Sequence, residues 1–151
     1  MSDLKLIALD AEDLSVLSAH LQDAVLRIGD LASLKGERRF AMVANRFDWA
    51  AAATGAGELV RRRSGIRFEH VLGAQLQGID LASGDRCLEL LAVSFSPIGE
   101  ETPEGHVTLT FAGGAGIRLH VECIEAELKD LGAAWATARR PCHEGPAGDK
   151  S

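Results

Sequence analysis

The sequence has little of what marks a specialised class of protein. Its 151 residues contain no apolar run close to the roughly 18 residues that a membrane-spanning helix requires. The three cysteines, Cys87, Cys123 and Cys142, are odd in number and widely spaced, so they do not resemble a disulfide framework. The N-terminus carries Lys5 inside a short apolar run flanked by acids, which is not the pattern of a signal peptide. We therefore expect a cytoplasmic protein without a membrane segment.

Motifs of catalysis and of metal or cofactor binding are also missing. The chain has no GxSxG elbow, no CxxC and no HxxxH, and His120-x-x-Cys123 with Cys142-His143 does not have zinc-site spacing. Five histidines show no spacing that brings them together: His20, His70, His106, His120 and His143. The sequence therefore predicts no catalytic residue, no cofactor and no metal site, and it favours a protein that is not an enzyme.

Charge is the feature that is most unevenly distributed. The net charge is −6, which argues against a general nucleic-acid binder, because such proteins gain affinity by neutralising phosphates. Residues 61–70 are the exception, with four arginines against one glutamate. Guanidinium groups bind oxyanions bidentately, so Arg61, Arg62, Arg63 and Arg67 form a candidate anion or RNA-phosphate site. The alternative is a solvated strand edge whose charges discourage aggregation.

Composition and patterning predict one α+β domain over residues 1–140, followed by a flexible tail at 141–151 that is rich in proline and glycine. A short strand within residues 4–9 precedes an amphipathic helix at 11–23, for which Asp10 is the expected N-cap. A first hairpin joins residues 25–34 to 38–49.

The remaining elements follow the same kind of pattern. A strand at 66–77 is expected to form a second hairpin with 86–97, and a third hairpin joins 107–111 to 117–121. Apolar residues at helical spacing predict a closing helix over 122–135: Ile124, Leu128, Leu131 and Trp135.

These elements predict a strongly bent or barrel-like antiparallel sheet of about six to seven strands with an N-terminal and a C-terminal helix. A barrel-like sheet plugged by its last helix, as in the pleckstrin-homology-like superfold, is one way to close it, on element order alone.

The glycine cluster in "LTFAGGAGIRLHVEC" (109–123) raises the possibility of a phosphate loop. Apolar residues alternate with polar ones on both sides of Gly113, Gly114 and Gly116, and no helix pattern follows directly, so a hairpin turn is the simpler interpretation. The outward residues of its second arm, Arg118, His120 and Glu122, form a candidate polar surface site.

Whole phrases of the chain, including "RFAMVANRFDW", "RRRSGIRFEHV" and "LGAAWATARRPCH", resemble a small uncharacterised bacterial family, one of the domains of unknown function. The similarity extends from about residue 4 to residue 143. It implies a bacterial, cytoplasmic, single-domain protein and no assigned activity. We therefore expect a non-enzymatic binding or protein-interaction domain whose partner is protein, either a second copy or another chain.

Overall fold

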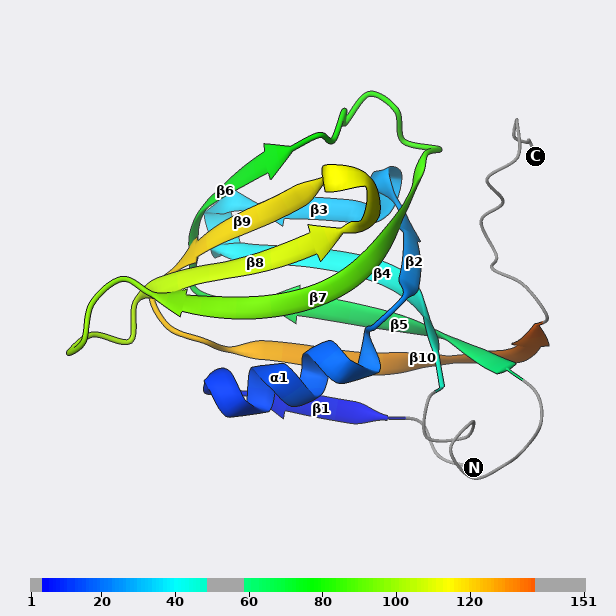
Figure 1. Cartoon of the computed structure of the whole chain (residues 1–151), viewed down its shortest axis with the longest axis horizontal. Helices are drawn as coiled ribbons and strands as arrows, with labels where there is room; N and C mark the ends of the chain where they lie inside the picture. Colours follow the sequence, from blue (N-terminus) through cyan, green and yellow to red (C-terminus); the bar gives the residue numbers. More distant parts are fainter. Residues whose placement is uncertain (1–3, 49–58, 138–151) are drawn as a thin grey trace.

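The computed structural model describes residues 4–48 and 59–137, with the backbone alone at 59 and 133–137. In these ranges the chain forms a ten-stranded antiparallel sheet and one α-helix, α1 (Ala11–His20) (Figure 1). The strands are β1 (Lys5–Ala8), β2 (Ala24–Arg27), β3 (Leu31–Leu34), β4 (Arg39–Phe47), β5 (Leu59–Phe68), β6 (Val71–Gln77), β7 (Cys87–Pro97), β8 (Gly105–Phe111), β9 (Gly116–Val121) and β10 (Ala126–Thr137). Three short 3-10 turns are η1 (Ile28–Asp30), η2 (Lys35–Glu37) and η3 (Ala112–Gly114).

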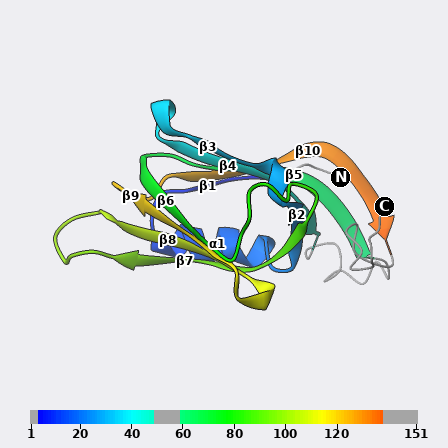
Figure 2. The ribbon, with the colours of Figure 1, turned by 90° about the horizontal axis from the view of Figure 1, so that it is seen from above.

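The sheet is bent into two layers and remains open. Its strand order is β1-β10-β5-β4-β2-β7-β8-β9-β6, and β3 pairs with β4 beside this path. The bend falls at β2, which pairs with both β4 and β7, so the strands on either side of β2 lie in different layers (Figure 2). The two end strands, β1 and β6, do not pair with each other.

Helix α1 connects the two layers at one side of the core. It packs on β1 in one layer and on β7 in the other (Figure 1). The expected cap is present, since the Asp10 carboxylate accepts a hydrogen bond from the Asp13 N–H at 2.8 Å. Leu14 and Leu17 on α1, with Leu21 just after it, are buried in the apolar core between the layers. The helix predicted over 11–23 is confirmed at residues 11–20.

The predicted C-terminal helix is wrong, because residues 126–137 form strand β10 between β1 and β5. Ile124 and Leu128 are four residues apart, a spacing that fits a helix turn and also two steps of a strand. Burial alternates with a period of two, since Ala126 and Asp130 are also buried and Leu131 is exposed. Ala126 and Asp130 thus distinguish the strand from the helix. The helix prediction considered only the spacing of large apolar residues and so did not use these two positions.

The predicted second hairpin is also wrong. Residues 66–77 form the end of β5 and all of β6, separated by a corner at which His70 adopts a left-handed φ of 60°. Strand β6 pairs with β9, and β7 pairs with β2 and β8. A non-glycine residue rarely adopts positive φ, so nothing in the local pattern indicated this corner.

The third hairpin and part of the first are confirmed. Strands β8 and β9 pair around η3, where Gly113 and Gly114 have φ of 84° and 88°, so the glycine cluster makes a turn. Strands β3 and β4 pair around η2, although η1 separates β2 from β3.

The predicted α+β class is therefore corrected to an antiparallel sheet with one helix. Ten strands replace the expected six to seven, and the sheet does not close as a pleckstrin-homology-like barrel would. The proposed tail at 141–151 lies outside the described residues.

Candidate functional site

The arginine cluster on β5 is divided between the two faces of the sheet. Arg61 is fully buried and its guanidinium lies 3.7 Å from the ring centre of Phe47, while Nη1 donates to the Asn45 carbonyl at 2.8 Å. Arg62 is 6% exposed and its Nε donates to Asp48 at 2.7 Å. These two guanidinium groups are packed into the protein.

The other two arginines of the cluster lie closer to solvent. Arg67 bridges Glu127 on β10 and Glu69 at the end of β5. Arg63 is exposed and makes no ion pair with any residue in the described ranges. The candidate anion site at Arg61, Arg62, Arg63 and Arg67 stays a prediction, and Arg63 is its exposed member.

A buried ion pair that sequence reasoning missed lies beside this cluster. The Arg46 guanidinium on β4 donates to both oxygens of the Asp130 carboxylate on β10, at 3.0 and 2.8 Å. The carboxylate also accepts hydrogen bonds from the Ser64 hydroxyl at 2.6 Å and the Leu4 N–H at 2.8 Å. Burial alone raises the pKa of Asp130, but these hydrogen bonds outweigh it and lower the pKa. The network therefore joins β4, β5 and β10 to the residue just before β1.

His20 at the end of α1 lies within the electrostatic influence of this network. Burial lowers the pKa of its imidazole, and the Arg46 charge lowers it further. The spacing of charges along the chain gave no sign of this arrangement, because its members are brought together from three separate strands, the residue just before β1 and the helix.

The candidate polar trio on the second arm of the glycine hairpin does not converge. Glu122 lies at the corner beyond β9, where it pairs with Arg38 at 3.3 Å and lies 3.9 Å from His70. The His70 imidazole also contacts Glu125 at 2.8 Å. Arg38 and His70 both have left-handed φ, of 52° and 60°, so this exposed corner carries local backbone strain.

His120 and Arg118 remain together on the outward face of β9. His120 contacts the Glu104 carboxylate at 2.5 Å and lies beside His106, with the ring centres 5.4 Å apart. Burial lowers the pKa of His106, and the charges of Arg118 and His120 lower it further. The Glu104 carboxylate acts in the opposite direction, so this end of the face carries charges of both signs.

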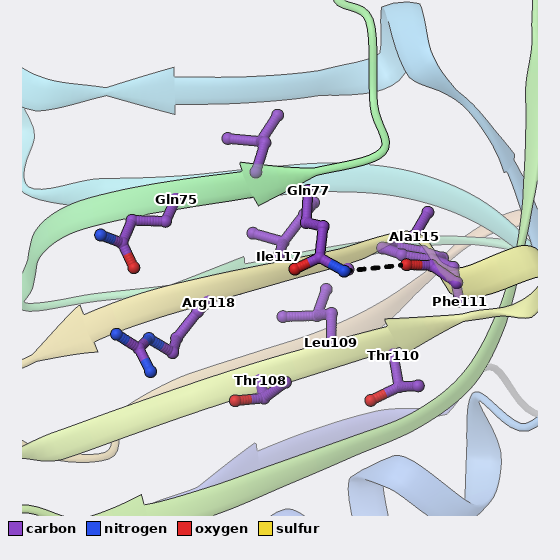
Figure 3. A pocket seen from close by; sticks show the side chains of 12 residues that line it. Gln75, Gln77, Thr108, Leu109, Thr110, Phe111, Ala115, Ile117 and Arg118 are labelled. Atoms are coloured by element: carbon purple, nitrogen blue, oxygen red, sulfur yellow. Dashed lines mark hydrogen bonds between the residues drawn. The ribbon is translucent and has the colours of Figure 1, made fainter.

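A hollow of about 550 Å³ opens beside Arg118 on the face formed by β6, β8 and β9 (Figure 3). Cross-strand pairing places Thr108, Arg118 and Gln75 in one row, and Thr110, Gly116 and Gln77 in the next. Because Gly116 has no side chain, the middle of the second row is empty, and the neighbouring side chains surround that gap.

The lining of the hollow combines polar and apolar groups and contains a single charge. Arg118 is the one charged residue among its twelve lining residues, and it forms no ion pair within residues 4–48 and 59–137. The Gln77 amide donates to the Gly114 carbonyl at 3.4 Å, which fixes one side of the rim (Figure 3). The hollow can therefore offer hydroxyl, amide and guanidinium donors to a ligand.

The titratable side chains predicted as candidates, Arg118 excepted, lie apart from the hollow. His70 and His120 each contact a carboxylate, but neither lines the hollow. No group of three metal-ligating His, Cys, Asp or Glu side chains occurs in the part of the chain that the structure describes. Burial raises the pKa of the Cys123 thiol, which is free.

Fold and site together define an open antiparallel-sheet domain with one helix and a polar hollow on one of its sheet faces. The chain belongs to the family described as Protein of unknown function (DUF2948), which matches residues 4–143. This confirms the resemblance seen in the sequence, and it brings no assigned activity. No curated protein and no solved structure matches the chain. Among the described residues, no helix has the length and hydrophobicity that crossing a membrane requires.

Proposed function

We propose that this chain is a non-enzymatic interaction domain that pairs with a second copy of itself along the free edge of β6. The observation that carries the proposal is the chemistry of that edge. Residues 71–77 contain no charge and no proline, although β6 is the last strand of the sheet. Edge strands in soluble proteins usually carry charged residues or proline, because their unpaired backbone groups otherwise recruit another strand.

The backbone of β6 has hydrogen-bonding capacity that the described fold does not use. Strand β6 forms a ladder with β9 on one side. On its other side, the Val71 N–H donates to the Arg38 carbonyl at 2.9 Å, which occupies only the first position. From Gly73 to Gln77 the register with β9 is regular, after a shift between Val71 and Gly73. These five residues offer an edge of about 17 Å.

The opposite end of the sheet is protected in ways that β6 is not. Strand β1 has four residues, includes Lys5, and is packed by α1. Short length, a lysine and a covering helix are three of the devices by which edges avoid pairing. The register shift at the start of β6 is one such device, but it leaves the segment from Gly73 onward unprotected.

A two-fold axis at Gln75 would make the β6 edge self-complementary. Antiparallel pairing about that residue places Leu76 of one copy opposite Ala74 of the other, and Gly73 opposite Gln77. Leu76 is 36% exposed and Leu72 is 44% exposed, so pairing would cover apolar surface as well as backbone groups. The chain has a net charge of −6, but no charge on β6 opposes this approach.

Sedimentation analysis over a wide range of protein concentration tests the proposal. Because a single strand pair buries less than a standard interface, we expect a weak dimer whose population rises with concentration. Leu72→Lys should shift the equilibrium toward monomer, since it adds a charge to each edge. Leu81→Lys is the matched control, because Leu81 is 64% exposed and lies outside the strand. A chain that stays monomeric throughout, or equal effects of both lysines, would contradict the proposal.

The arginine cluster on β5 supports a second candidate, an anion or RNA-phosphate binding module. The observation in its favour is the exposed guanidinium of Arg63 next to the buried Arg62. Arg63→Gln should then abolish salt-dependent binding of a phosphate-bearing ligand, while leaving the fold intact because the side chain is exposed. Unchanged binding by Arg63→Gln would contradict this candidate.

A further inference from the structure

We propose that the hollow beside Arg118 is an oxyanion site, which binds a small organic ligand through a carboxylate or phosphate group. This site lies on the face of β6, β8 and β9, apart from the arginine cluster on β5. It uses side chains on that face, whereas pairing at the β6 edge uses backbone groups, although both include Gln75 and Gln77. Three features of the described residues support it: the charge of the lining, the arrangement of donors and the volume of the hollow.

The charge of the lining favours an anion. Arg118 is exposed, makes no ion pair with a described residue, and has no carboxylate among the residues that line the hollow with it. A guanidinium presents a planar fork of N–H donors that matches an oxyanion in two hydrogen bonds. The chain has a net charge of −6, yet Arg118 makes no ion pair with a described residue. Its guanidinium N–H groups are therefore available to a ligand.

The donors beside Arg118 come from adjacent strands and fall in one row. The Thr108 hydroxyl and the Gln75 amide flank Arg118 directly across the sheet. Neighbouring strands lie about 4.8 Å apart, so groups on three strands can reach one ligand. Figure 3 shows these side chains on the same face. The arrangement gives an oxyanion hydrogen bonds on both sides of the guanidinium.

The volume of the hollow favours an organic anion over a bare ion. About 550 Å³ falls within the range of small-molecule sites and exceeds the space that a single inorganic anion fills. The second row supplies the extra room, because Gly116 lies between Thr110 and Gln77 and adds no side chain. Hydroxyl and amide groups at that end would bind polar atoms in the body of the ligand.

His106 supplies an internal reporter of occupancy. It lies on the same face. Burial is the main cause that lowers its pKa, the charges of Arg118 and His120 lower it further, and the Glu104 carboxylate opposes them. An anion bound to Arg118 would neutralise part of that charge and so raise the pKa of His106 toward its ordinary value. A ligand bound at the β5 arginine cluster would lack this effect, since His106 lies on β8.

The test is an NMR titration with acetate, inorganic phosphate and chloride at matched ionic strength, using wild type, Arg118→Gln and Arg63→Gln. We expect saturable shifts at Gly116 and Thr110 with acetate or phosphate, absent with chloride, lost in Arg118→Gln and retained in Arg63→Gln. The His106 pKa should rise on saturation in wild type only. Whichever of acetate and phosphate binds more tightly identifies the oxyanion as carboxylate or phosphate.

Three outcomes would overturn the proposal. They are the absence of saturable shifts, equal shifts with chloride, and a response lost in Arg63→Gln but retained in Arg118→Gln. The last of these would move the anion site to the β5 cluster. Repeating the titration on Leu72→Lys separates this inference from the proposed self-association, because Leu72 does not line the hollow.

Discussion

Asp130 is the residue on which one end of the sheet depends. Asp130 is 4% exposed and Arg46 is 2% exposed. The Asp130 carboxylate binds the Arg46 guanidinium, a hydroxyl and a backbone N–H. A buried pair of this kind adds little net stability by itself, since desolvation offsets the attraction. Removing one partner is costly, however, because the other charge is then left buried.

Asp130→Asn should therefore lower the free energy of unfolding near neutral pH by about 3–5 kcal/mol. The substitution should also flatten the acid limb of the stability profile. The pKa of Asp130 is lowered on folding, so its stabilisation is present above the unfolded-state value of about 3.9 and is lost as the pH falls through the folded pKa. Urea unfolding at several pH values measures both effects. The exposed Asp85→Asn is the control, and an unchanged acid limb in Asp130→Asn would contradict this account.

Sequence reasoning at this scale found exposed residues better than buried ones. The alternation after the glycine cluster placed Arg118 on an outward face, where it is exposed. The same local view could not indicate that Arg62 is buried against Asp48, or that Arg46 meets Asp130. Both pairings depend on which strands become neighbours, and that information is not contained in any short segment.

Strand β10 shows at the scale of elements how two periodicities can compete. Its register with β5 shifts between Asp130 and Ala134, and Gly132 within the shift has a φ of 94°. The helix predicted over 122–135 had this glycine in its interior. In the strand it is the position that allows the irregularity, because other residues avoid this conformation.

Gly132→Ala should lower the free energy of unfolding by about 1–3 kcal/mol. The cost is conformational, because an added Cβ at Gly132 meets no atom within 4 Å. Gly36→Ala is the matched control, since its Cβ also meets nothing within 4 Å and its φ is not positive. Chemical denaturation of both variants provides the comparison, and equal stabilities of the two would show that the φ at Gly132 is not a constraint.

The elements that were predicted correctly are those stabilised by local signals. Asp10 caps α1, and two adjacent glycines form the turn between β8 and β9. The incorrect ones, the β6–β7 hairpin and the final helix, required knowledge of distant partners: β9 for β6, and β1 and β5 for β10. When two strands pair in the sheet but are distant in the sequence, the spacing of residues within either strand does not indicate the pairing.

At the scale of the whole molecule, the open sheet leaves two unlike ends. One end, β1, is short, charged and packed by α1, whereas the other, β6, is longer, uncharged and exposed. The polar hollow lies on the face beside β6. The two proposed binding surfaces therefore share the same end of the molecule, but they use different atoms: the backbone edge for a second copy and the Arg118 side chain for an anion.

Hydrogen–deuterium exchange at low and high protein concentration tests the central claim, pairing at the β6 edge, most directly. The amides between Gly73 and Gln77 that point away from β9 should exchange more slowly at high concentration, because the second copy would protect them. Amides of β1 should be unaffected. Exchange along β6 that is identical at both concentrations would contradict the account.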